Sequence, residues 1–106
     1  DALRRGQQVR LRAASWSMHP AIRPGDLLVA QGRLPEVGEI ALARRDGELV
    51  THRMHARDGG AYLLRGDAPG SQPHRVEASD IVGTVIEVRR DLRSWLAWLL
   101  RRLPWH

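Results

Sequence analysis

The sequence predicts a small, mainly β protein, barrel-like or sandwich-like, with six to seven short strands and a C-terminal amphipathic helix. Up to Val88, apolar residues recur with the period of two that is typical of strands, and turn residues interrupt them about every eight to twelve residues. After Val88 the apolar period becomes that of a helix. A chain of 106 residues can bury one core, so we expect a single domain, with residues 1–90 forming the β-rich part and residues 91–106 the helix.

The expected strands follow one another with short connections. The first, over residues 9–13, alternates apolar and basic side chains and leads into a loop that contains two serines. A buried strand over residues 27–30 follows the turn Pro24-Gly25-Asp26. Further strands are expected over residues 39–43, 48–55, 61–64, 75–76 and 81–88, and Asp46-Gly47 predicts a hairpin between the first two of these.

The strand over residues 48–55 distinguishes one histidine from the others. Side chains alternate between the two faces of a strand, so His52 shares its face with the apolar Val50 and Met54. Arg53 and His55 fall on the opposite face, which we expect to meet solvent. His52 is therefore the histidine that burial can tune toward neutral pH. The remaining internal histidines are expected at the surface: His19 and His74.

The helix expected over residues 91–103 ends before Pro104 and has an apolar stripe of Leu92, Trp95, Leu96, Leu99 and Leu103. Its length of about 20 Å is too short for the hydrocarbon core of a bilayer, which is about 30 Å thick. The stripe predicts packing on the sheet or on a second copy. A helix lying in a membrane interface is the alternative, because arginines and tryptophans cluster there. These tryptophans are Trp95, Trp98 and Trp105.

Composition limits the chemistry. All 17 basic residues are arginines, which stay protonated in proteins, so a general base has to be histidine or carboxylate. The chain has no cysteine, which excludes thiolate metal sites, and the histidine spacing predicts no metal or other cofactor. The net charge is +5, but the arginines are scattered along the chain, so no nucleic-acid partner is expected.

The sequence also bears on the cellular location of the protein. No run of about 20 apolar residues and no secretory signal is present, so we expect a cytoplasmic protein or one peripheral at the membrane. The chain begins at Asp1 rather than methionine, so we expect a processed or trimmed sequence, and whether an upstream anchor has been removed is left open. The oligomeric state is left open.

The loop Ser15-Trp16-Ser17-Met18-His19-Pro20 holds the candidate nucleophile. Pro20 fixes its own φ and restricts His19, so the chain after Ser17 is held in a narrow range of shapes. A serine on a stiffened loop between strands suits a nucleophile, but it equally suits an ordinary turn serine. The later segments decide between these two interpretations.

Together with those segments, the loop resembles the signal peptidase I and LexA-type superfamily of serine peptidases. The loop is similar to that family's Ser/Gly-x-Ser-Met-x-Pro box, and Thr51-His52-Arg53 falls where bacterial members carry Lys-Arg and the endoplasmic-reticulum and archaeal type carries His-Arg. Three more segments resemble the family's Val-Gly-Asp-Ile, Lys-Gly-Asp and Val-Val-Gly: Val37-Gly38-Glu39-Ile40, Arg65-Gly66-Asp67 and Ile81-Val82-Gly83. The resemblance covers roughly residues 9–88 in the family's order.

The resemblance implies that Ser17 is the nucleophile and His52 the general base. The Ser17 N–H and the Ser15 hydroxyl would form the oxyanion hole, and Asp67 would orient or electrostatically support the histidine. The absence of lysine agrees, because a Ser–Lys dyad is impossible here.

This chain also departs from the family pattern. Gln72 fills the slot where a second acid is often found, so the third member of the site rests on Asp67. Asp80 and Asp26 are weaker alternatives, and Asp26 is expected to be structural.

The function that the resemblance implies is a serine endopeptidase of signal-peptidase type. It would bind an extended peptide along a strand edge and cut a leader or signal-like peptide after a small residue. The missing membrane anchor favours a free-standing peptidase that trims a leader peptide or matures one partner protein. Two alternatives remain: a non-catalytic peptide- or partner-binding module on the same fold, and an arginine-rich tail that binds nucleic acid or an anionic membrane.

Overall fold

The computed structural model describes residues 2–104, so Trp105 lies outside the described residues. In chain order the elements are β1 (Gln8–Arg12), β2 (Leu27–Gln31), β3 (Ile40–Arg45), β4 (Glu48–Asp58), β5 (Ala61–Arg65), β6 (His74–Glu77), the 3-10 helix η1 (Ala78–Asp80), β7 (Ile81–Arg89) and α1 (Leu92–Leu100). The mainly β fold with a C-terminal helix is therefore confirmed.

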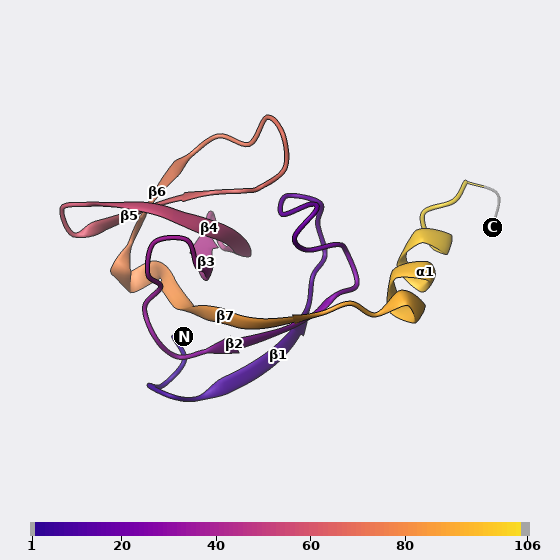
Figure 1. Cartoon of the computed structure of the whole chain (residues 1–106), viewed down its shortest axis with the longest axis horizontal. Coiled ribbons are helices and arrows are strands. Elements are labelled where there is room, and N and C mark those ends of the chain that lie inside the picture. The colour runs from indigo at the N-terminus through magenta and orange to yellow at the C-terminus, as the bar shows by residue number, and fades with distance from the viewer. Residues whose placement is uncertain (1, 105–106) are drawn as a thin grey trace.

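The strands form one antiparallel sheet in the order β1-β2-β7-β3-β4-β5-β6. This sheet bends into a half-barrel, in which β1, β2 and β7 form one layer and β4, β5 and β6 lie opposite them (Figure 1). The strand register shifts by a residue between Val29 and Ala30, between Leu42 and Ala43, and between Met54 and Ala56. Such bulges bend strands and increase their twist, which is how a sheet of short strands curves.

Two of the three apolar clusters of the core lie on either side of the site, and one of them holds the segment around Ser17. One joins β3, β4, β5, β6 and the start of β7, and it consists of Ala41, Ala43, Met54, Tyr62, Leu64, Val76 and Ile81. The other contains Met18, Ile22, Leu28 and Val85, so Met18 of the serine loop and Ile22 just after it belong to the core. Met18 and Ile22 are each only 1% exposed. The residue that follows Ser17 is therefore held by core packing.

The strand predictions are confirmed in order, with shifted ends. The strand expected over residues 48–55 continues to Asp58, because β5 pairs with this extension through Tyr62 and Ala61. The short edge expected over 75–76 is the four-residue strand β6, which pairs with β5. The local sequence pattern does not predict the extra length of β4 and β6, because that length depends on hydrogen bonds from the neighbouring strand.

Helix α1 is shorter than expected. Asp91 caps its first turn by accepting hydrogen bonds from the N–H groups of Arg93 and Ser94. The helix ends at Leu100, and the next residues form turns. No helix among residues 2–104 is long and apolar enough to cross a membrane.

One side of α1 packs on the serine loop. The rings of Trp98 and Trp16 meet edge to face at 5.5 Å, and Arg12 pairs with Asp91 at 2.9 Å. Gly25, with φ of +89°, lies so close to the helix that a Cβ there would be 2.9 Å from the backbone nitrogen of Trp95. The helix therefore contacts the loop at the end of the molecule that Figure 1 shows beside β1 and β7.

The opposite side of α1 is uncovered. Leu92, Leu96 and Leu100 recur every four residues and are 62%, 48% and 54% exposed. The expected apolar stripe is thus divided between a side that packs on the serine loop and a side that faces solvent.

Candidate functional site

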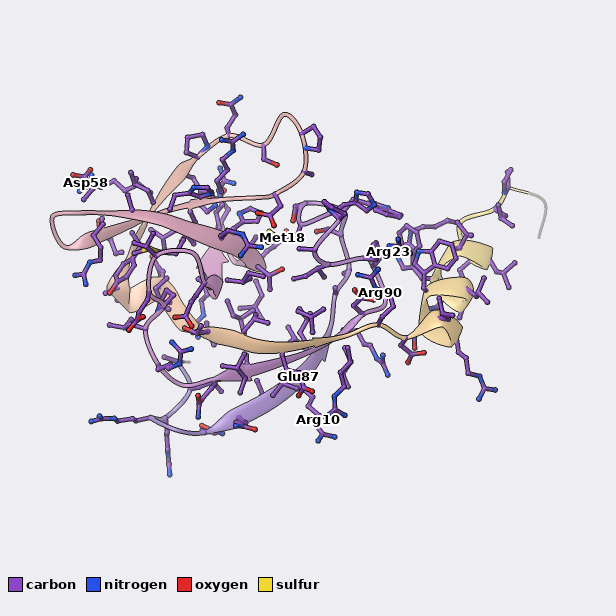
Figure 2. All side chains as sticks on the ribbon, viewed as in Figure 1. Arg10, Met18, Arg23, Asp58, Glu87 and Arg90 are labelled. Carbon is purple, nitrogen blue, oxygen red and sulfur yellow. The ribbon has the colours of Figure 1, made fainter. Side chains whose placement is uncertain are left out.

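The backbone of Ser17 is held between the core and the loop that joins β5 to β6. The Ala68 N–H donates to the Ser17 carbonyl at 3.0 Å, and the Asp67 N–H donates to the sulfur of Met18 at 3.4 Å. In Figure 2, Met18 lies between the serine loop and the β4–β5 layer. The two segments that resemble family motifs, the serine loop and Arg65-Gly66-Asp67, therefore pack against one another.

Gly66 is the closest point of that contact. A Cβ at this position would lie 2.5 Å from the Ser17 carbonyl oxygen and 2.9 Å from the Ser71 hydroxyl, so no other residue fits without movement. Arg53 and Arg65 are the last pair of the β4–β5 register at this end, and Gly66 follows Arg65 directly. Gly66 therefore links the Ser17 backbone to the end of β5 that pairs with β4 next to His52.

The two serines of the loop lie together. Their hydroxyl oxygens are 3.1 Å apart, and the Ser17 N–H points to the Ser15 hydroxyl at a long 3.4 Å. Ser17 is half-buried and Ser15 is exposed. The two groups expected to form the oxyanion hole are thus neighbours beside the Ser17 hydroxyl.

His52 is 9% exposed and lies on the face that the sequence predicted. Burial and the positive charge of Arg45 lower the pKa of His52, and the negative charge of Asp67 opposes this effect. Within residues 2–104 no hydrogen bond joins Ser17 to His52. Such bonds often tighten only when substrate binds, so the arrangement is compatible with a nucleophile and its base.

The partner of His52 is His74, a residue that the sequence analysis placed at the surface. That prediction is wrong: His74 is half-buried, and its Nε2 lies 2.7 Å from the Nδ1 of His52. The two rings are nearly perpendicular, at 73°. Burial, Arg45 and His52 lower the pKa of His74 to about 4, against a weaker opposite effect of Asp46. The signal in the sequence was weak, because only the alternation of His74 with Val76 suggests an inward face.

Asp67 is engaged by Arg53. The guanidinium donates to both carboxylate oxygens, with an Nη2–Oδ2 distance of 2.7 Å, and also donates to the Gly38 carbonyl at 2.7 Å. The prediction that Arg53 faces solvent is wrong, since its side chain is only 30% exposed. Strand alternation places Arg53 on the face opposite His52, and Asp67 follows Gly66 onto that face. Asp67 therefore acts on His52 through its charge and not through a hydrogen bond.

The other acidic candidates lie elsewhere. Asp26 is fully buried and accepts the Arg23 N–H at 2.9 Å, while Arg90 lies 3.3 Å from the same oxygen. It closes the turn that ends the serine loop, which agrees with the structural role expected for it. Asp80 is exposed in η1, and Gln72 is exposed in the β5–β6 loop. Within residues 2–104, no group of three or more histidine or acidic side chains forms a metal site.

A cavity of about 400 Å³ adjoins the two serines. Its walls come from the end of β1, the residues up to Ser17, one residue each of β2 and β3, and the first half of β4: Leu11, Arg12, Ala13, Ala14, Ser15, Ser17, Leu28, Leu42, Glu48, Leu49, Val50 and Thr51. β4 pairs with β3 over residues 48–53 but with β5 only from Arg53 onward. Residues 48–52 therefore leave one strand edge unpaired beside the cavity.

Comparison with known families gives one match. The family model described as Peptidase S24-like matches residues 2–86. This range contains the serine loop, His52, the Gly66 contact and His74, and it ends before α1. No curated protein matches the sequence.

Proposed function

Because the chain belongs to the Peptidase S24-like family, we propose that it is a serine endopeptidase in which Ser17 is the nucleophile and His52 the general base. The observation that carries the proposal is the contact of Gly66 with the Ser17 backbone, because Gly66 directly follows the strand that pairs with β4 next to His52. A serine hydroxyl is a weak nucleophile until a neighbouring base takes its proton. His52 is neutral at pH 7, because burial lowers its pKa, and a neutral imidazole can accept that proton.

In the reaction, the Ser17 oxygen attacks the carbonyl carbon of the scissile peptide while His52 takes the hydroxyl proton. The negative oxygen that develops would be stabilised by the Ser17 N–H and the Ser15 hydroxyl, which lie beside the nucleophile. His52 then gives its proton to the leaving amine. In the second half, His52 takes a proton from water, the water oxygen attacks the acyl carbon, and the Ser17 oxygen leaves with the proton from His52.

The substrate in this proposal is an extended leader or signal-like peptide, cut after a small residue. The unpaired edge of β4 over residues 48–52 supports this, because a peptide can add there as a further strand and reach Ser17 across the cavity. The apolar part of the cavity wall, with Leu28, Leu42 and Val50, suits uncharged side chains. A non-catalytic binding module could use the same edge but would leave the peptide intact.

A fluorophosphonate probe separates these two functions. We expect one covalent adduct per chain in intact-mass spectra, located at Ser17 by peptide mapping and absent from Ser17→Ala. Ser15→Ala should still be labelled at Ser17, although more slowly, because only a stabilising hydroxyl is lost. A chain that binds candidate leader peptides yet forms no adduct and cuts none of them would be a binding module.

We also propose that the exposed side of α1 rests on an anionic membrane surface. Of its three uncovered leucines, Leu92 is followed by the exposed Arg93 and Leu100 by the exposed Arg101, so apolar area and positive charge occur together, whereas Arg102 stacks on Trp98 on the packed side. This combination is typical of helices that lie in the interface of anionic bilayers.

Replacing Leu92, Leu96 and Leu100 together with glutamine should reduce binding to phosphatidylglycerol vesicles by about tenfold or more, as measured by co-sedimentation. The control variant has glutamine at Leu34 and Val37, which are 51% and 64% exposed and lie outside α1. The control should bind like the unchanged chain. Equal binding of all three proteins would contradict the proposal, and a dimer that the triple variant loses would show instead that a second copy covers the helix.

A further inference from the structure

The His52–His74 hydrogen bond occupies the ring nitrogen on which the orientation of a catalytic histidine depends. In a Ser-His-Asp triad, the acid holds the Nδ1–H of the histidine so that Nε2 is free to take the serine proton. Here the Nδ1 of His52 lies 2.7 Å from the Nε2 of His74, whereas the carboxylate of Asp67 is held by Arg53. Among residues 2–104 the Nε2 of His52 has no hydrogen-bond partner, and the Nδ1 of His74 is buried and also has none.

We propose that His74 is a positioning residue that accepts a hydrogen bond from the Nδ1–H of His52 and so keeps the Nε2 of His52 free to act as the base. This inference rests on the proposed peptidase function. The opposite arrangement, in which the Nε2–H of His74 donates to His52, would place the proton of His52 on Nε2. His52 could not then accept the proton of Ser17 at that atom.

The proton balance of the reaction fits this role. When His52 takes the Ser17 proton on Nε2, it becomes a cation with both ring nitrogens protonated. Its Nδ1–H still donates to the neutral His74, so the cation is stabilised and no proton has to move to His74. Delivery of the Nε2 proton to the leaving amine restores the starting pair.

The charged groups around the pair favour a neutral His74, which is the state in which one of its ring nitrogens can accept a hydrogen bond. Arg45 at the end of β3 disfavours protonation of both rings, and His52 disfavours protonation of His74. Asp46, in the β3–β4 turn, and Asp67 act in the opposite direction on His74 and His52 respectively. The net lowering of the His74 pKa to about 4 leaves this ring neutral at pH 7.

Two substitutions of His74 test the inference. Glutamine offers a carbonyl oxygen that can accept from the Nδ1–H of His52, whereas phenylalanine fills the space without an acceptor. We expect His74→Phe to lower kcat for a cleaved peptide by about 10- to 30-fold with KM within about twofold, and His74→Gln to recover most of this loss. His55→Gln, at an exposed position of the same strand, should leave kcat unchanged. Equal losses in the two His74 variants that follow their melting temperatures would show a merely structural role and overturn the inference.

Nitrogen-15 NMR of the histidine rings gives a reading that does not require turnover. We expect His52 to be the Nδ1–H tautomer at pH 7 in the unchanged chain and a mixture of tautomers in His74→Phe. An Nε2–H tautomer in the unchanged chain, or full kcat in His74→Phe, overturns the role of His74 while the peptidase function stands. An Nδ1–H tautomer in a chain that neither forms the Ser17 adduct nor cuts peptides overturns the proposed function, and with it this role.

Discussion

Ser17→Ala and His52→Ala should each lower kcat by about 10³-fold or more, and the double variant should be little worse than either single one. The reason is that the serine oxygen and its base act as one unit: without either, the other contributes almost nothing to the attack on the carbonyl carbon. Steady-state cleavage of one leader peptide by the three variants measures this effect. Melting temperatures accompany the kinetics, because His52 is nearly buried and its loss can also weaken the fold.

The pH profile of the same reaction identifies the base. His52 must be neutral to accept a proton, and burial lowers its pKa below the ordinary value of 6.5. The rate should therefore rise with pH along a limb centred below pH 6.5 and then stay level through neutral pH. The residual activity of His52→Ala should lack this limb.

His55→Ala is the matched control for the base. His55 lies three residues further along β4 and is exposed, so its loss should leave kcat within about twofold of the unchanged chain. A dead His55 variant beside an active His52 variant would show that the base is assigned to the wrong residue. Near-full activity in both would exclude histidine catalysis on β4.

The sequence predicted the residues whose positions follow from local patterns. The alternation along β4 placed His52 inward and His55 outward, and the turn residues delimited the serine loop. These features depend on neighbours in the chain, so one sequence suffices. The family resemblance added the order of the motifs, and the family match over residues 2–86 confirms that resemblance.

The contacts that complete the site depend on the pairing of strands far apart in the chain. His74 reaches His52 because β6 pairs with β5 through Leu64, and a four-residue strand gives almost no signal of its own. Arg53 meets Asp67 for a similar reason, since both lie on the face opposite His52. A charged residue on an outward face normally remains in solvent, and the sequence alone does not show that a loop covers it.

Gly66→Ala should lower kcat by on the order of 10²-fold in a chain that stays folded. The new Cβ would lie 2.5 Å from the Ser17 carbonyl oxygen, a separation that backbone atoms cannot tolerate. β5 is fixed in the sheet and Asp67 is held by Arg53, so the serine loop has to give way. Misplacement of reacting groups by about 1 Å is enough for a loss of this size. Peptide cleavage, melting temperature and fluorophosphonate labelling rate measure the effect.

Gly60→Ala provides the matched control. Gly60 lies in the β4–β5 turn, where a Cβ would meet nothing within 4 Å, so this variant should keep full turnover and stability. In Gly66→Ala, kcat and the labelling rate should fall together, because both depend on where the Ser17 oxygen stands relative to His52. A Gly66→Ala chain that cuts peptide as fast as Gly60→Ala would show that the contact with Ser17 is dispensable. Ser17 and His52 would then not be brought together at Gly66, and the geometric basis of the proposed peptidase would fail.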